Sequence, residues 1–155
     1  MTARAVLFLD IDGVLHSSSG HQNRLSRLPL LEAWLRQRPT VDVVIASTWR
    51  LRRSLSELAT LFSPDLRPRI VGTTPIISAD LWEAPPMYLR QAEVTAWLRE
   101  HARAGGTWDR WAALDDQHWL FPPFTKQLVA IDDPTVGVTG DELAELDRVL
   151  GETKP

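Results

Sequence analysis

The chain reads Phe8-Leu9-Asp10-Ile11-Asp12-Gly13-Val14-Leu15 at the point where its first apolar run, Ala5–Leu9, gives way to acids. A short, uninterrupted apolar run is typical of a buried strand. Residues i and i+2 of an extended chain point the same way, so the carboxylates of Asp10 and Asp12 are expected to face one pocket. Gly13 then allows a sharp turn. A polar strand end with a simple Asp-Gly turn is the alternative interpretation.

The rest of the chain alternates apolar runs with helical patterns. Further strands are expected over residues 41–46, 69–72, 111–114 and 127–131. Apolar residues at helical spacing predict helices over residues 28–35, 51–62 and 94–101. The motif Thr139-x-x-Glu142 predicts a capping box ahead of a last helix. This alternation indicates an α/β fold, in which a Rossmann-like parallel sheet of about five strands lies between two layers of helices.

Composition narrows the function classes. The 155 residues show no repeat or linker, so residues 1–155 are expected to form a single domain. The chain has no cysteine, which excludes disulfides, thiol nucleophiles and thiolate metal sites. Its net charge of −3 provides no overall positive field for nucleic acid, although a local basic patch would escape this count. No run has the length of a signal-peptide core or of a membrane span, so we expect a cytoplasmic protein.

Polar residues follow several predicted strands at the point where each one ends. Besides Asp10-x-Asp12, they are the pairs Ser47-Thr48, Asp115-Asp116 and Asp132-Asp133. Because ligands bind outside the carboxyl ends of parallel strands, these residues predict one composite site. Carboxylates within ~4–6 Å of each other repel and need a cation. Oxygen ligands suit a hard ion such as Mg²⁺. A solvated turn is the alternative interpretation of Asp115-Asp116.

Hydroxyl and guanidinium groups follow the second predicted strand. Ser47 and Thr48 lie where that strand meets a helix, and the free N–H groups at a helix start are suited to binding phosphate. Arg50 is a further candidate for phosphate binding, ahead of Arg52 and Arg53. The simpler alternatives are that the hydroxyls cap the helix and that the arginines form its solvated face.

Three segments, in this order, resemble the haloacid dehalogenase-like superfamily of phosphohydrolases. They are Phe-Leu-Asp10-Ile-Asp12-Gly-Val-Leu, Val-Ile-Ala-Ser47-Thr48-Trp-Arg50 and Ala-Leu-Asp115-Asp116. The first matches the opening motif of the family. The strings Ser47-Thr-Trp-Arg50 and Arg90-x-x-Glu-Val-x-x-Trp-Leu98 are similar to a branch found as stand-alone proteins and in nucleic-acid repair polypeptides. The resemblance extends from about residue 5 to residue 150.

The resemblance implies a mechanism and a metal. Asp10 would attack phosphorus and form an aspartyl-phosphate. Asp12 would protonate the leaving group and then activate water. Mg²⁺ would be held by Asp10, by the backbone carbonyl of Asp12, and by Asp115 or Asp116. The expected reaction is therefore the Mg²⁺-dependent hydrolysis of a phosphomonoester.

The resemblance also implies groups that bind the phosphoryl oxygens. Ser47 or Thr48 would donate a hydrogen bond to one of them. The family places a basic residue at a helix start before the last acidic pair, and Arg90 fits that place. Lys126 is the alternative, but it follows the acidic pair. With Arg50, these residues complete the predicted phosphate site.

Other titratable residues are expected to have simpler roles. Asp132-Asp133 competes with Asp115-Asp116 for the metal, but Pro134 follows it and favours a turn. His16 and His21 are expected to be exposed loop residues, and His118 is not assigned a role.

The intervals 13–40 and 51–89 leave no room for a full cap domain. By resemblance, members without a cap act on macromolecular ends or rely on partners to close the site. A nucleic-acid 3′-phosphate is therefore the leading substrate. The alternatives are a phosphatase of small metabolites or nucleotides, a non-catalytic binding module on the same fold, and a phosphoacceptor signalling domain.

Overall fold

The computed structural model of the chain describes residues 4–19, 24–77, 86–103 and 110–151. Five strands in this part of the chain form one sheet, and every neighbouring pair is parallel. They are β1 (Ala5–Leu9), β2 (Val41–Ile45), β3 (Ile70–Thr73), β4 (Arg110–Asp115) and β5 (Leu128–Ala130), in the order β3-β2-β1-β4-β5. Each strand falls on a segment that the sequence predicted as a strand, and the parallel sheet is confirmed.

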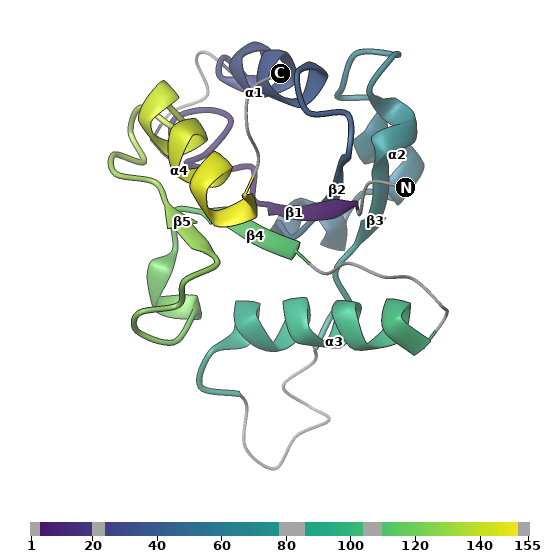
Figure 1. The fold of residues 1–155 in the computed structure, drawn as a ribbon, viewed down its shortest axis with the longest axis vertical. Coiled ribbons are helices and arrows are strands. Elements are labelled where there is room, and N and C mark those ends of the chain that lie inside the picture. Colours follow the sequence, from purple (N-terminus) through teal and green to yellow (C-terminus); the bar gives the residue numbers. More distant parts are fainter. Residues whose placement is uncertain (1–3, 20–23, 78–85, 104–109, 152–155) are drawn as a thin grey trace.

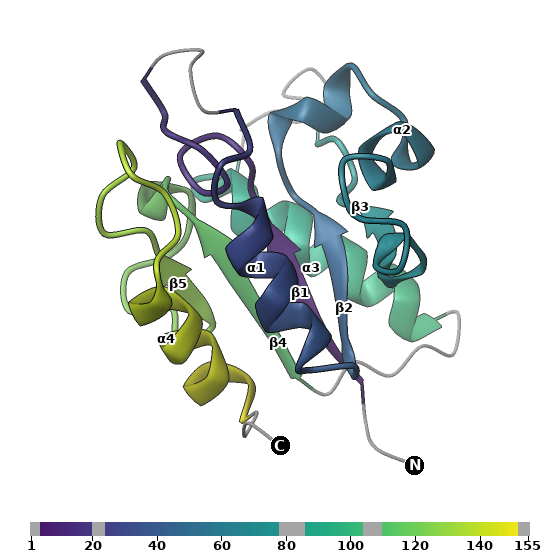
Figure 2. The ribbon, with the colours of Figure 1, turned by 90° about the horizontal axis from the view of Figure 1, so that it is seen from above.

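Helices cover both faces of this sheet. Within the described residues the α-helices are α1 (Leu28–Arg36), α2 (Leu55–Ala59), α3 (Leu89–Arg103) and α4 (Gly140–Leu150). Figure 1 shows α3 on one face and α1 and α4 on the other. In Figure 2 the view passes α1 and α4 before it reaches the strands, with α3 behind them. The predicted three-layer arrangement is confirmed. None of the helices among the described residues is long and apolar enough to span a membrane.

Strand β1 is buried on both of its faces, which explains why its sequence is apolar throughout. Leu7 and Leu9 belong to a core cluster shared with α1, α2 and α4. Val6 and Phe8 belong to a second cluster shared with α3, where the ring of Phe8 meets Trp97 edge to face with the centroids 5.5 Å apart. Because both layers hold this strand, they also fix the position of the residues that follow it.

The order of the strands places β1 at a topological switch. From β1 the chain moves to β2 and β3 on one side of the sheet and later returns to β4 and β5 on the other. In open α/β sheets, ligands bind in the crevice at such a switch. Among the described residues, the interval 13–40 holds loops and α1, and the interval 51–89 holds short helical turns, α2, β3 and loops. Neither contains a cap domain, so this crevice has no domain folded over it.

One helix start and one helix cap differ from their predictions. The helix expected over residues 51–62 begins only at Leu55, because Ser54 and Glu57 form a capping box there and the preceding residues Thr48–Leu51 form a separate 3₁₀ turn. The capping box predicted at Thr139 is wrong: its side chain accepts no bond from the helix and donates instead to the Glu142 carboxylate. That carboxylate also accepts the backbone N–H of Asp132 at 3.3 Å, which ties α4 to the loop after β5.

Candidate active site

The site forms where β1 ends between β2 and β4. The backbone N–H of Asp10 donates to the carbonyl of Leu114 at 3.1 Å, so the residue after β1 is still held against β4. On the other side the N–H of Ala46 donates to the carbonyl of Leu9 at 2.8 Å. These two bonds hold the ends of β1, β2 and β4 at the same edge of the sheet. Side chains from separate parts of the chain therefore meet at one edge.

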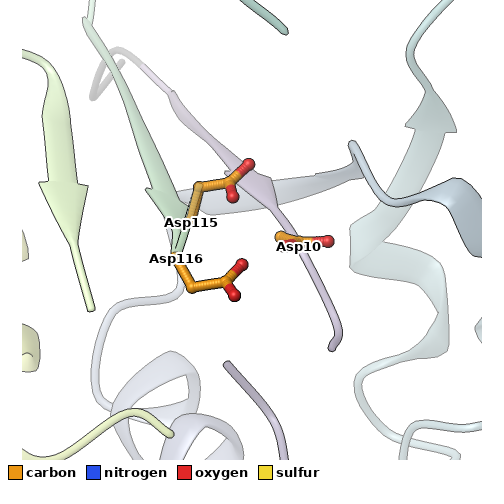
Figure 3. Close-up of side chains that lie close together, drawn as sticks. All are labelled: Asp10, Asp115 and Asp116. Atoms are coloured by element: carbon orange, nitrogen blue, oxygen red, sulfur yellow. The ribbon is translucent and has the colours of Figure 1, made fainter. Parts of the chain in front are cut away.

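Three carboxylates gather at this edge. Asp10, Asp115 and Asp116 each offer an oxygen atom, and these oxygens all lie within 4.8 Å of one another. Figure 3 shows Asp115 and Asp116 reaching from the end of β4 toward Asp10 at the end of β1. The Asp10 residue is only 6% exposed and Asp115 only 2%. Water therefore does little to screen their mutual repulsion.

The pKa values of the two buried acids, Asp10 and Asp115, are both raised. Burial raises the pKa of Asp10 well above its ordinary value, and the charge of Asp115 raises it further. Burial also raises the pKa of Asp115, although the nearby Arg90 guanidinium acts in the opposite direction. A group of oxygen ligands that resists ionisation without a cation fits a hard divalent ion such as Mg²⁺. These residues could therefore hold the metal that the sequence predicted.

Gly13 makes space for the third carboxylate. Its φ of +75° lies in the left-handed region that favours glycine. A Cβ atom at this position would lie 2.4 Å from Oδ2 of Asp116, closer than non-bonded atoms approach. The glycine thus serves both the sharp turn after β1 and the approach of Asp116 to the site.

The Asp12 carboxylate is held by two donors. His16 lies with Nε2 2.7 Å from Oδ1 of Asp12, and Trp49 donates from Nε1 to Oδ2 at 3.1 Å. The turn at residues 13–15 brings His16 back beside Asp12, and the two residues form a backbone bridge. The expectation that His16 is an exposed loop residue is wrong, because only 10% of its side chain is exposed. His21 lies outside the described residues.

The backbone determines which nitrogen of His16 carries the proton. Its Nδ1 accepts the N–H of Leu25 at 3.1 Å, so Nδ1 needs a free lone pair. The proton of the neutral ring then sits on Nε2, from which it is donated to Asp12. His16 therefore orients the Asp12 carboxyl, whose side chain remains 57% exposed to an incoming group.

Arg90 reaches the acidic cluster from the first turn of α3. Its Nε lies 3.3 Å from Oδ2 of Asp115, and one terminal nitrogen lies 3.4 Å from Oε1 of Glu93. The side chains of all three residues are almost completely buried. Among the described residues, Nε of Arg90 nevertheless has no hydrogen-bond partner of good geometry. A buried guanidinium with an unused donor beside the acids is suited to an additional anionic ligand.

Arg50 has a different environment from the one expected for a phosphate ligand. Its guanidinium donates to the carbonyls of Ser47 at 2.9 Å, Thr74 at 3.0 Å and Pro75 at 3.4 Å, and it also pairs with Glu93. Only 5% of the Arg50 side chain is exposed. These bonds favour a supporting role, in which Arg50 joins the loops after β2 and β3 to the α3 residue that also contacts Arg90.

The two hydroxyl residues after β2 differ in exposure. Ser47 is completely buried, and its Oγ accepts the backbone N–H of Trp49 at 3.2 Å. This bond caps the 3₁₀ turn, as the simpler interpretation of the sequence held. Thr48 is exposed at the start of that turn. Both residues lie at the carboxyl edge of β2, beside the end of β1.

The remaining acidic pair does not join the cluster. Asp133 is exposed, and it accepts the N–H of Thr135 at 3.0 Å and the hydroxyl of the same residue at 2.6 Å. These bonds lower the pKa of Asp133. They form the turn that Pro134 indicated. His118 stacks edge to face against Trp119, and Lys126 is exposed in the loop before β5.

Sequence analysis missed His16, Trp49 and Glu93. Their positions held weak signals: His16 follows Asp12 by four residues, and Glu93 follows Arg90 at the i,i+3 spacing of neighbours on a helix. Nothing in the sequence indicated that the Trp49 indole would turn toward Asp12.

Comparison with known proteins agrees with the geometry. Residues 6–143 match the family model described as "HAD domain in Swiss Army Knife RNA repair proteins". No curated protein and no solved structure matches the chain significantly. The matched region includes the strands of the sheet and all three acids of the cluster. The chain therefore belongs to this family of HAD domains, within the haloacid dehalogenase-like superfamily that its motifs resemble.

Proposed function

We propose that the protein is a Mg²⁺-dependent phosphatase that hydrolyses phosphomonoesters through an aspartyl-phosphate on Asp10. The observation that carries this proposal is the buried group of Asp10, Asp115 and Asp116, whose oxygens lie within 4.8 Å of one another. Carboxylates this close and this buried are unfavourable on their own. Membership of a HAD family supports the same reading.

In the first half of the reaction, an oxygen of Asp10 attacks phosphorus as the bond to the leaving oxygen breaks. Asp12 gives its proton to that leaving oxygen. In the second half, water attacks the phosphoryl group on Asp10 and passes a proton to Asp12. This releases inorganic phosphate and restores both residues. The bonds from His16 and Trp49 keep the Asp12 carboxyl in position for both transfers.

Mg²⁺ would be held by Asp10, by the backbone carbonyl of Asp12, and by Asp115 or Asp116. When bound, the ion neutralises negative charge between the nucleophile and the phosphoryl group. The turn at Gly13 brings the Asp116 carboxylate beside the backbone that would share the ion. Asp115 also accepts the N–H of Gln117 at 2.9 Å, which limits the freedom of its side chain.

Arg90, with Ser47 or Thr48, would bind the phosphoryl oxygens. Arg90 supplies a buried positive charge at the edge of the acidic cluster, and its Nε lacks a well-aligned partner in the part of the chain that the structure describes. A preorganised guanidinium of this kind stabilises the charge that develops during transfer. Glu93 forms an ion pair with Arg90, and Arg50 forms an ion pair with Glu93. We assign Arg50 to this support rather than to direct contact with phosphate.

The substrate we propose is a phosphorylated nucleic-acid end, with a 3′-phosphate as the leading case. The absence of a cap domain in the described residues leaves the crevice open to a large substrate. The description of the matched family, which refers to RNA repair proteins, supports the same class. A phosphatase of small metabolites or nucleotides would use the same acids and would differ only in its preferred substrate.

The test is phosphate release from para-nitrophenyl phosphate and from a 3′-phosphorylated oligoribonucleotide, with Mg²⁺ and with EDTA. We expect release by the wild type that requires Mg²⁺ and that Asp10→Asn lowers by at least about a thousandfold. Preference for the oligonucleotide would support the nucleic-acid end, and equal use of both would favour a small-metabolite phosphatase. Failure of the folded wild type to release phosphate from either would contradict the proposal and favour a non-catalytic binding module.

A further inference from the structure

A pocket opens beside Asp12, outside the acidic cluster. It has a volume of about 330 Å³ and is lined by Thr48, Trp49, Leu51, Arg52 and Arg53. The indole of Trp49 joins it to the site, because Nε1 of this ring donates to Asp12. The pocket and the residue that would protonate the leaving group therefore share the Trp49 side chain.

Unpaired positive charge surrounds this pocket. The guanidinium carbon of Arg53 lies 4.4 Å from the centroid of the Trp49 ring, and that of Arg24 lies 4.8 Å from it. Among the residues that the structure describes, no carboxylate lies within 4.0 Å of Arg24, Arg52 or Arg53. Guanidinium groups stacked on an indole are held in place with their N–H edges free.

Most other arginines among the described residues have a partner, which for Arg27, Arg67 and Arg69 is a backbone carbonyl. Arg4 pairs with Asp42, Arg36 with Asp65, and the Arg38 side chain with Asp147. In a chain of net charge −3, arginines left without acids at the mouth of one site indicate an anionic ligand.

We propose, on the basis of the function proposed above, that this Trp49–arginine pocket binds the nucleotide next to the terminal phosphate of a single-stranded nucleic acid. Phosphodiester oxygens accept from guanidinium groups in a planar, two-point fashion. Bases stack on exposed aromatic and guanidinium planes. Leu51, which is 54% exposed at the pocket, adds an apolar contact.

The size of the pocket favours one nucleotide unit over a folded partner. Its volume lies at the low end of the range of roughly 300–1,000 Å³ typical of small-ligand sites. The terminal phosphate would occupy the acidic cluster with its metal, and the preceding nucleotide would lie across Trp49. A phosphomonoester without a second phosphate would gain nothing from Arg52 and Arg53. The pocket would thus select a strand end over a small metabolite.

The experiment measures binding rather than turnover. Asp10→Asn, which cannot form the phosphoenzyme, is titrated into fluorescently labelled 3′-phosphorylated oligomers, one of RNA and one of DNA with the same sequence. A nucleoside 3′-monophosphate competes in a third arm. We compare Arg52→Glu/Arg53→Glu with Arg148→Glu. Arg148 lies on α4 with 73% of its side chain exposed, so it provides a control with the same kind of charge reversal.

We expect an oligomer to bind at least about tenfold more tightly than the monophosphate, and the double variant to lose that advantage. The slope of log affinity against log salt should become shallower by about 0.7, because one phosphate contact is lost. Arg148→Glu should retain the advantage. A preference for RNA or for DNA would identify the sugar that the pocket accepts.

Equal binding of oligomer and monophosphate would overturn the inference, as would an unchanged slope in the double variant. These results are separate from a failure of the proposed function. A wild type that releases phosphate from para-nitrophenyl phosphate but shows no strand preference is a phosphatase without this subsite. A wild type that releases none, yet whose strand binding depends on Arg52 and Arg53, has the subsite without the activity.

Discussion

Two acidic regions of this molecule differ in the partners that surround their carboxylates. The first is the cluster of Asp10, Asp115 and Asp116 at the ends of β1 and β4. The second is a groove of about 520 Å³ between β5 and α4. Its acidic lining residues are Asp132, Asp133, Asp141, Glu142 and Glu145. The groove has more acids than the cluster, yet among the described residues no three of its acids lie close enough together to hold a metal ion.

Local partners explain the difference. In the groove, Asp133 accepts two bonds from Thr135, and Glu145 pairs with Arg148. In the cluster, Asp10 and Asp115 face each other in a buried position, and the pKa of each is raised. The pKa of Asp133 is lowered instead. A site for a cation is therefore indicated by convergent carboxylates whose pKa values burial raises, and the number of acids is a poor guide.

The largest expected contrast is in metal binding. Asp115→Asn and Asp116→Asn should each weaken Mg²⁺ binding, and the residue that contacts the ion should weaken it by about a hundredfold, because a ligand is lost. Asp132→Asn in the groove should leave the affinity within about twofold of the wild type. Calorimetric titration with Mg²⁺ measures all three. Equal losses of Mg²⁺ affinity on substitution of Asp132 and of the cluster residues would mean that the groove also contributes to binding the ion.

The second contrast concerns two glycines. Gly13→Ala should displace the Asp116 carboxylate and strain a left-handed backbone position, with a loss of about 1–3 kcal/mol in stability and about tenfold in Mg²⁺ affinity. Gly140→Ala is the matched control, because nothing lies within 4 Å of its added Cβ at the start of α4. That variant should be neutral or more stable. Denaturant unfolding with and without Mg²⁺ compares them, and an unaffected Gly13→Ala would refute the proposed crowding.

The third contrast concerns His16, which would position the general acid Asp12 without being the acid itself. His16→Phe removes the donor to Asp12 but keeps an aromatic ring, so kcat should fall about tenfold with little change in KM. His118→Phe, on an aromatic pair outside this contact, is the control. A rise in KM without a fall in kcat in His16→Phe would contradict this role of the contact.

The smallest expected effect is a gain in stability. Because the pKa of Asp10 is raised on folding, the folded chain binds more protons than the unfolded chain, and stability falls as pH rises from the ordinary value through the raised one. Asp10→Asn should therefore melt several degrees above the wild type at pH 7 in EDTA, at about 3 °C per kcal/mol.

Asp133→Asn should behave in the opposite way. Its lowered pKa contributes stability that is present at neutral pH and is lost as pH falls through the lowered value. The variant should thus melt slightly below the wild type at pH 7 and match it in strong acid. Added Mg²⁺ should raise the Tm of the wild type more than that of Asp10→Asn. A lower Tm for Asp10→Asn in EDTA would contradict the account of charge repulsion.

Much of the fold was predictable, because the sequence patterns that indicate strands and helices are local. The apolar run before Asp10 predicted β1, and the alternation of strands and helices predicted a parallel sheet, whose geometry brings strand ends to one edge. The meeting of Asp10 with Asp115 and Asp116 followed from that rule, whereas Asp132 and Asp133, to which the rule also applied, do not join the cluster. Membership of the superfamily followed from the same segments.

The rest depended on contacts between distant side chains. Arg50 follows a strand that borders the site, so its sequence position suggested a phosphate ligand. Only the packing of α3 brings Glu93 into contact with the Arg50 guanidinium. His16 looked like an exposed loop residue because no sequence pattern encodes a turn that folds it under Asp12. The role of Trp49 likewise depends on a side-chain rotation that periodicity does not determine.

The most direct test of the account is to trap the phosphoenzyme. Wild type is mixed with Mg²⁺ and a 3′-phosphorylated oligoribonucleotide, quenched in acid during turnover and digested, and the peptides are weighed by mass spectrometry. The account predicts one added phosphoryl group on the peptide that contains Asp10, lost in Asp10→Asn and absent in EDTA. A phosphoryl group on another residue, or turnover with no covalent intermediate under conditions that trap a known aspartyl-phosphate enzyme, would contradict it.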